Sequence, residues 1–336
     1  MSITWEAFKN RMVRLMMTKQ VSDLLKIQYP IIQAPMAWLT DAKLVAAVGE
    51  AGGLGILGPN AGQDELTSDP VETAERMRQE IIKVRQLTDR PFGVMVATPR
   101  PGERIADNVF TREMLKMLFE AQVHYFAVVG SVNAELFDLI KAHHGLIIYR
   151  ALTPTVADAK QAESLGADLI VATGRDEGGL LPAREYGTFT VVPAIVDAVS
   201  VPVLAAGGVN DRRGVKAAFA LGAQGVYVGT RFMVTRESPL AKSAKQLIVD
   251  STYDQVAEVS LDQRSITTKL ARQFAQAFQQ PSRRMNMDSK INQAGGLRPA
   301  MRLGNLDEGI VEVNTGIDTI HDVPTVAELV ERLMTD

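Results

Sequence analysis

The chain has 336 residues, no cysteine and a formal net charge of −3. Its length suits one large α/β domain or two small ones, and its 46% hydrophobic composition can supply a large core. The weak negative charge gives no general attraction to nucleic acid or to an anionic membrane, and the lack of cysteine excludes disulfides, thiolate metal sites and a cysteine nucleophile. No apolar run approaches the roughly 18 residues that a membrane helix needs. The lack of cysteine fits a cytoplasmic location. We expect a small-molecule substrate, no metal site, and no nucleic-acid or membrane partner.

The first segment has apolar residues at the spacing of one helix face, namely Trp5, Phe8, Met12, Leu15 and Met16. The acidic Glu6 and the polar breaks between these residues argue against a targeting peptide. The segment is predicted to be an ordinary helix that packs on the rest of the protein.

Short apolar runs recur along the next 200 residues. Each run is apolar nearly throughout, which is typical of parallel strands that are buried on both faces. The predicted strands are Ile31–Met36, Leu54–Leu57, Phe92–Ala97, His124–Val129, Leu146–Ala151, Asp168–Thr173, Val201–Ala205 and Gly225–Val228.

Helical patterns separate these runs. Asp69 stands before a proline at the start of one of them, and glycines follow several others, as expected at the two ends of a helix. The predicted helices are Asp41–Ala51, Pro70–Leu87, Arg112–Ala121, Ala134–His143, Val156–Leu165, Val191–Val199 and Arg213–Leu221.

Eight strands with intervening helices predict an α/β fold, a (βα)₈ TIM barrel. The rhythm ends near Thr235, beyond which Ser238–Val259 and Ser265–Phe278 are predicted helices and Pro281–Asn305 a polar, loop-rich stretch. We expect residues 1–235 to form the barrel, including the N-terminal helix. Residues 236–336 are expected to form a mainly helical C-terminal addition that packs on one end of the barrel, without being an independent domain. Its apolar residues Ile310, Val311 and Val313 are expected to be core residues, with a cover over a ligand or a homodimer contact as alternatives.

Glycines gather after the seventh and eighth predicted strands, in Ala205–Val209 and Val228–Phe232. The loops at these two positions of a barrel often bind a phosphate group. Glycine lets backbone N–H groups approach phosphate oxygens closely, and Thr230 and Arg231 could add a hydroxyl donor and a charge. The alternative is a pair of tight turns that bind nothing.

With these residues placed, the chain resembles the FMN-dependent nitronate monooxygenases, once called 2-nitropropane dioxygenases, and the related FMN-dependent enoyl-ACP reductases. The resemblance covers about residues 22–236. It rests on Pro30–Ala37, Glu50–Gly55, Pro91–Val94 and the two glycine clusters, in order along the chain.

The resemblance implies an FMN site. Ala34, Pro35 and Met36 would lie along the isoalloxazine ring, and Thr173, Gly178 and Gly179 would contribute from the sixth strand and its loop. The phosphate would be held by Gly207, Gly208, Gly229 and Thr230.

Three positions depart from the family's pattern, and the first is Thr173, where the family's sixth loop commonly carries a glutamate. The sixth loop of the family commonly ends in a histidine that is assigned a catalytic role, and here the residue is Leu180, which cannot transfer a proton. Met95 stands where many relatives carry asparagine. His124, His143 and His144 do not obviously replace the missing histidine, because they precede strands and should lie at the opposite end of the barrel. The fourth histidine, His321, falls in the C-terminal addition, where the barrel pattern assigns it no position.

Charged and phenolic side chains follow the fifth and sixth strands instead. We hypothesise that Arg150 or Arg175 binds an anionic group of the substrate and that Tyr186 donates a proton. The alternative is a solvated loop with surface ion pairs.

The resemblance implies an FMN-dependent oxidoreductase that oxidises nitronates with O₂. An alternative is a reductase that takes hydride from NAD(P)H and passes it to enones, enoyl thioesters or quinones. A third alternative is a non-catalytic FMN-binding protein. In the first two cases the flavin carries the redox chemistry and the protein supplies binding, orientation and electrostatics.

Overall fold

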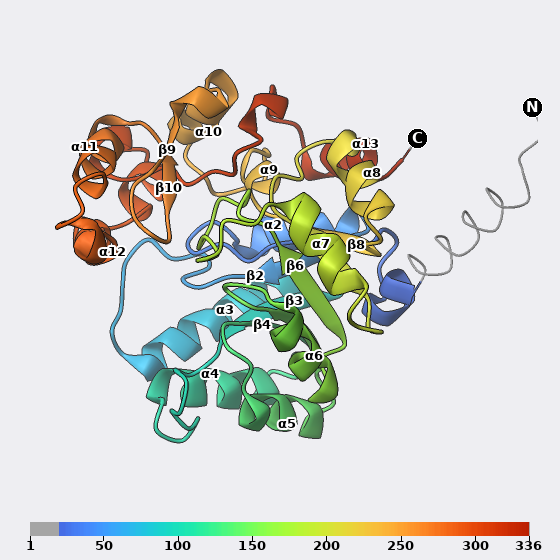
Figure 1. Ribbon diagram of the computed structural model, residues 1–336. Helices are drawn as coiled ribbons and strands as arrows, with labels where there is room; N and C mark the ends of the chain where they lie inside the picture. The colour runs from blue at the N-terminus through green and yellow to red at the C-terminus, as the bar shows by residue number, and fades with distance from the viewer. Residues whose placement is uncertain (1–19, 336) are drawn as a thin grey trace, which may run out of the picture.

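The computed structural model describes residues 20–335, and in it eight parallel strands close into a barrel in chain order (Figure 1). This confirms the predicted (βα)₈ fold; the predicted helix at Trp5–Met16 lies outside the described residues. The strands are β1 (Ile31–Gln33), β2 (Leu54–Leu57), β3 (Phe92–Ala97), β4 (Tyr125–Val129), β5 (Leu146–Arg150), β6 (Leu169–Thr173), β7 (Val203–Ala206) and β8 (Gly225–Val228).

The strands are apolar because both of their faces are covered. Side chains such as Ile32, Ile56 and Val171 fill the inside of the barrel, whereas Val94, Phe126 and Ile147 pack outward against the helices. A continuous apolar run is therefore the pattern that such a strand requires. The surrounding helices are α2 (Ala42–Glu50), α3 (Pro70–Leu87), α4 (Val109–Glu120), α5 (Ala134–Ala142), α6 (Val156–Ser164), α7 (Thr188–Val196) and α8 (Arg212–Ala220).

The helix ends follow the predicted chemistry. The Asp69 carboxylate accepts hydrogen bonds from Val71 N at 2.8 Å and Glu72 N at 2.9 Å, which caps α3. Gly52, Gly166 and Gly222 have φ of +91°, +95° and +95°, the left-handed conformation that stops the helices before them.

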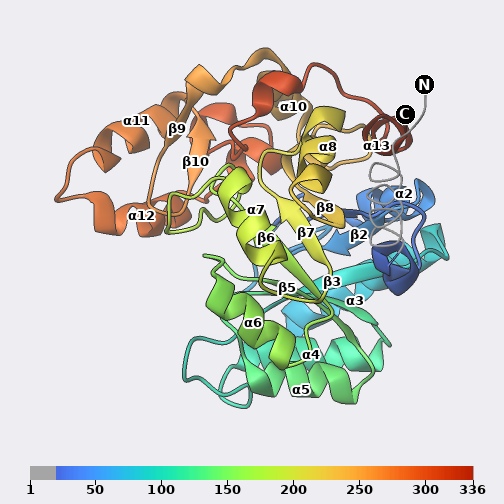
Figure 2. The same ribbon diagram turned by 45° about the vertical axis from the view of Figure 1, so that its right-hand side comes forward.

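The eighth helical position of the barrel is filled by the end of the described chain. Helix α13 (Val326–Met334) packs against α2 and α8, and its Leu329 and Leu333 belong to the same core as the outward faces of the strands. Both views show α13 beside α8 and α2 (Figures 1 and 2).

The segment between β8 and α13 differs from its prediction. The helix predicted at Ser238–Val259 is the shorter α10 (Lys242–Asp250), and strand β9 (Val256–Glu258) follows it. Strand β10 (Arg264–Ile266) occupies the start of the second predicted helix, of which α11 (Lys269–Phe278) forms the rest. β9 and β10 form an antiparallel pair, and Ile266 also bridges to Val311. The stretch that was predicted to be loop-rich contains α12 (Met287–Gln293) and a short π-helix at Arg298–Arg302.

This segment lies at one side of the barrel in both views (Figures 1 and 2). One buried apolar cluster joins this segment, including its short helix α9 (Thr230–Met233), to the loop after β1. The cluster includes Trp38, Met233 and Met301. Ile310, Val311 and Val313 are fully buried, in agreement with the core packing expected for them. Within the described residues, no helix is long and apolar enough to cross a membrane.

Candidate active site

The main cavity lies at the carboxyl ends of the strands and has a volume of about 530 Å³, within the range of about 300–1,000 Å³ typical of ligand pockets. Loops after β1, β2, β6, β7 and β8 line it together with parts of the C-terminal segment. The structure brings together nearly all residues of the predicted cofactor site, namely Ala34, Pro35, Met36, Gly178, Gly179, Gly207, Gly208, Gly229 and Thr230.

The glycines of this cavity are needed for different reasons. Gly207 has φ of +103°, and a Cβ there would lie 2.7 Å from Thr188 Oγ1, so the fold itself requires glycine. At Gly229 a Cβ would have ordinary contacts, 3.6 Å from Met36 Sδ and 3.9 Å from Ala34 Cβ. Both neighbours line the cavity, so the space that a Gly229 side chain would take is space for a ligand.

The glycine loops also offer hydrogen-bond donors. Within the described residues, the backbone N–H groups of Gly208, Gly229 and Thr230 have no protein acceptor. Thr230 Oγ1 accepts a hydrogen bond from Asn314 N at 3.1 Å, which leaves the hydroxyl proton available to donate. Free N–H groups and a hydroxyl around a cavity are the chemistry that a phosphate group requires, so these residues fit the phosphate end of FMN.

A segment from the C-terminal part joins the two glycine loops. Asn314 and Asn210, which follows the loop after β7, exchange side-chain hydrogen bonds of 2.7 and 2.9 Å. Gly178 approaches the same segment so closely that a Cβ there would lie 2.4 Å from Asn314 N. The residues after Ile310 therefore form a wall of the cavity as well as core.

Arg231 does not extend the phosphate site. Its guanidinium is buried and forms an ion pair with Asp322, with Nη2 2.7 Å from Oδ1. Arg231 is also absent from the residues that line the cavity, so its charge stabilises the attachment of the segment before α13.

Arg150 reaches the cavity but is already paired. Its Nη2 lies 2.6 Å from both carboxylate oxygens of Glu177, and both side chains are nearly inaccessible to solvent. Burial raises the pKa of Glu177, and the Arg150 charge acts in the opposite direction. The predicted anion-binding arginine is thus occupied by a carboxylate of the protein.

Arg175 and Tyr186 do not line the cavity. Arg175 forms an ion pair of 2.8 Å with Glu258 of β9, and its backbone N–H donates to the Tyr186 carbonyl at 2.8 Å. The Tyr186 side chain is 53% exposed. The sequence could not reveal this arrangement, because the partner strand β9 was not predicted.

Because Tyr186 lies outside the cavity, we expect the turnover number of Tyr186→Phe to stay within about twofold of the wild type. This expectation replaces the proton-donor role that the sequence suggested for Tyr186. Proton donors in catalysis typically contribute 10²–10⁴-fold. Steady-state rates with saturating substrate distinguish these outcomes, and a loss of 100-fold or more would restore Tyr186 as the proton donor.

The structure also shows where Thr173, Leu180 and the histidines lie. Thr173 ends β6, is fully buried and is not among the residues that line the cavity; its Oγ1 has no hydrogen-bond partner in the described part of the chain. Leu180 lines the cavity. His124 directly precedes Tyr125, the first residue of β4, and His144 lies two residues before Leu146, the first residue of β5, at the opposite end of the barrel, as predicted.

Sequence reasoning missed Glu312, which lines the cavity from the C-terminal segment. Burial, and secondarily the charge of Glu177, raise the pKa of Glu312 to about 8. Nothing in the sequence around Glu312 signals this position, since it follows no barrel strand.

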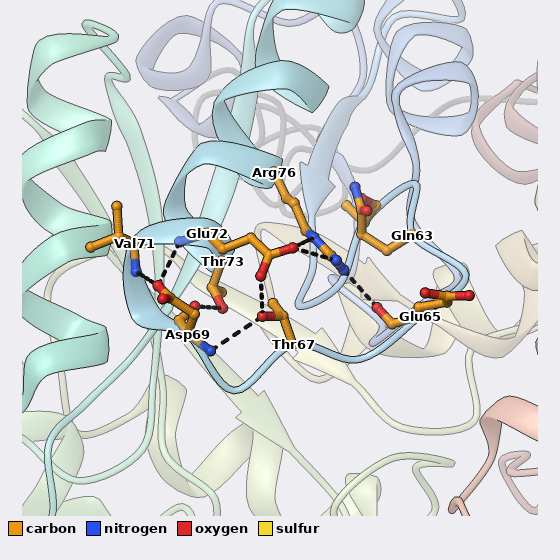
Figure 3. Close-up of polar contacts among 9 residues, drawn as sticks. Gln63, Glu65, Thr67, Asp69, Val71, Glu72, Thr73 and Arg76 are labelled. Carbon is orange, nitrogen blue, oxygen red and sulfur yellow. Dashed lines mark hydrogen bonds and ion pairs between the residues drawn. The ribbon is translucent and has the colours of Figure 1, made fainter.

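A second cavity of about 260 Å³ adjoins the main one, because Pro59 and Met95 line both. Its outer wall includes the loop before α3. Figure 3 shows how Arg76 fixes this loop: the guanidinium donates to the Glu65 carbonyl at 2.7 Å and to Glu72 Oε1 at 2.6 Å. Thr67 Oγ1 donates to the other Glu72 oxygen at 2.6 Å.

The described residues contain no group of three or more histidine, aspartate or glutamate side chains that could hold a metal ion. The ionisable side chains that line the main cavity are the Arg150–Glu177 pair, Tyr227 and Glu312, and the polar side chains of Thr230, Gln263, Asn292 and Asn314 line it as well.

Comparison with known proteins agrees with this geometry. The sequence profile of the nitronate monooxygenase family matches residues 18–336. A probable nitronate monooxygenase of Staphylococcus haemolyticus is 35% identical over 269 residues, covering 69% of this chain and 72% of the relative. The structure of FabK from Thermotoga maritima is similar with a TM-score of 0.79 and 31% identity over 94% of each chain. That of a nitroalkane oxidase from Streptomyces ansochromogenes has a TM-score of 0.74 and 26% identity, covering 94% of this chain and 96% of that one.

Proposed function

The chain belongs to the nitronate monooxygenase family and is a flavin-dependent oxidoreductase, and from this premise we propose that it binds FMN in the main cavity and oxidises nitronates with O₂. The observation that carries the proposal is the cavity itself, where two glycine loops with free N–H groups lie at the positions that phosphate-binding barrels use.

The residues that would hold FMN divide by chemistry. Gly208, Gly229 and Thr230 would donate hydrogen bonds to the phosphate, and Ala34, Pro35 and Met36 would lie against the ring with Gly178 and Gly179. When bound, the flavin supplies the electron-accepting chemistry. The protein's contribution is to orient the substrate and to control charge in the cavity.

Leu180 limits which substrates this cavity can serve. A neutral nitroalkane must lose a carbon-bound proton before it becomes a nitronate, and leucine cannot accept that proton. A preformed nitronate has already lost this proton and needs no base. We therefore propose that nitronates are substrates and that neutral nitroalkanes are poor ones.

A second candidate is an NAD(P)H-dependent reductase of enones, enoyl thioesters or quinones. The similarity to FabK over 94% of the chain favours it. A third candidate is a non-catalytic FMN-binding protein. It is suggested by Leu180, which stands where the family commonly carries a histidine. The three functions differ in what reduces the bound flavin.

Anaerobic mixing of the FMN-loaded protein with propionate-3-nitronate, NADH and NADPH separates them. Bleaching of the flavin bands by the nitronate, but not by NADH or NADPH, is expected. Bleaching by NAD(P)H alone would favour the reductase, and no bleaching by any of them would favour the non-catalytic protein.

We also propose a cytoplasmic location and the division near residue 235 into a barrel and an addition that packs on it. Homodimerisation stays a prediction that sedimentation of the purified protein can test.

A further inference from the structure

Glu312 is held in place by its neighbours in the chain. Val311 N donates to Ser265 Oγ at 2.8 Å, and the Val311 carbonyl accepts from Ile266 N at 3.0 Å. Two residues further, Asn314 is bonded to Thr230. The backbone of Glu312 is thus fixed between a strand and a predicted phosphate loop, and its side chain lies in the wall of the main cavity.

The Glu312 carboxyl has no hydrogen-bond or ion-pair partner among the described residues. The Glu312 side chain is partly buried and faces the cavity, and an unpaired charge in a poorly solvated place is costly. The other ionisable side chains that line the cavity are Arg150, Glu177 and Tyr227. Arg150 is the only cation among them, and Glu177 neutralises it at 2.6 Å.

We propose that Glu312 is a neutral carboxylic acid that donates a hydrogen bond to the negatively charged oxygen of the substrate. A neutral acid removes the repulsion that a second carboxylate would exert on an anion, and it supplies a hydrogen-bond donor where the paired Arg150 does not. The raised pKa of about 8 agrees with this protonation state at neutral pH. The identity of the anion rests on the proposed function, whereas the protonation state of Glu312 is independent of it.

The protonation state can be tested without turnover, by infrared difference spectroscopy of the FMN-loaded protein between pH 6 and pH 10. A protonated-carboxyl band that disappears with a midpoint near pH 8 is expected in the wild type. The band should be missing in Glu312→Gln. Glu308→Gln is the matched control, because Glu308 is exposed in the same segment and should leave the band unchanged.

The donor role is tested by the pH profile of kcat/KM with propionate-3-nitronate. In the wild type, kcat/KM should fall about tenfold per pH unit above about pH 8, as the acid ionises. Glu312→Gln keeps a neutral donor, so it should stay within about fivefold of the wild type at pH 7 and lose the alkaline fall. Glu312→Ala should be about 10- to 100-fold less efficient at pH 7, mainly through KM.

The outcomes separate the two proposals. A titrating band without nitronate turnover would leave the neutral acid intact and overturn the proposed substrate. Turnover of the nitronate with no Glu312-dependent band, or with an alkaline fall that persists in Glu312→Gln, would overturn the role of Glu312.

Discussion

Replacing Arg150 with alanine should lower the free energy of unfolding by about 3–5 kcal/mol, because the change leaves the carboxylate of Glu177 buried without its partner. The pair lies at the end of β5 and in the loop after β6, with both Glu177 oxygens 2.6 Å from one guanidinium nitrogen. Burial already raises the pKa of Glu177, so the variant should take up a proton at this residue on folding. Urea denaturation at pH 7 measures the loss.

A double variant, Arg150→Met with Glu177→Leu, tests whether the loss comes from the stranded charge. Removing both charged groups should recover most of the stability, since buried pairs are often replaceable by apolar residues. A loss below about 1 kcal/mol for Arg150→Ala alone would show that the pair is hydrated and contributes little.

Replacing Gly229 with alanine should weaken FMN binding by 100-fold or more, which corresponds to about 2.7 kcal/mol of binding free energy. The added Cβ meets protein atoms only at 3.6 Å and beyond, so it would compete with the ligand and not with the fold. The stability of the protein without FMN should change by less than about 1 kcal/mol. Titration of the apoprotein with FMN and thermal unfolding measure the two effects separately.

Gly207→Ala is the matched control in the neighbouring loop. Its φ of +103° and the approach of Thr188 Oγ1 to 2.7 Å predict a loss of about 1–3 kcal/mol in the stability of the apoprotein. If Gly229→Ala were to bind FMN with wild-type affinity, the phosphate would have to lie elsewhere.

The barrel could be predicted from the sequence because its determinants are local. Leu54–Leu57, Phe92–Ala97 and Gly225–Val228 are strands with the predicted bounds, and the Asp69–Pro70 start of α3 is also correct. Each depends on an apolar run, a cap or a turn that the sequence displays over a few residues.

The C-terminal part could not be predicted in the same way. β9 and β10 are three residues long and exist through pairing with each other and with Val311, which is distant in the chain. Residues of the predicted FMN site that follow a strand line the main cavity, whereas the pairing of Arg150 and the position of Glu312 depend on contacts between distant parts of the chain. Met95, which stands where many relatives of the family carry asparagine, lines both cavities.

The central claim, a flavin site in the main cavity, is tested most directly by the absorption spectrum of the purified protein after incubation with FMN and removal of the free cofactor. Flavin bands from stoichiometric FMN should stay with the wild-type protein and should be lost from Gly229→Ala. A folded wild-type protein that retains no FMN would contradict it.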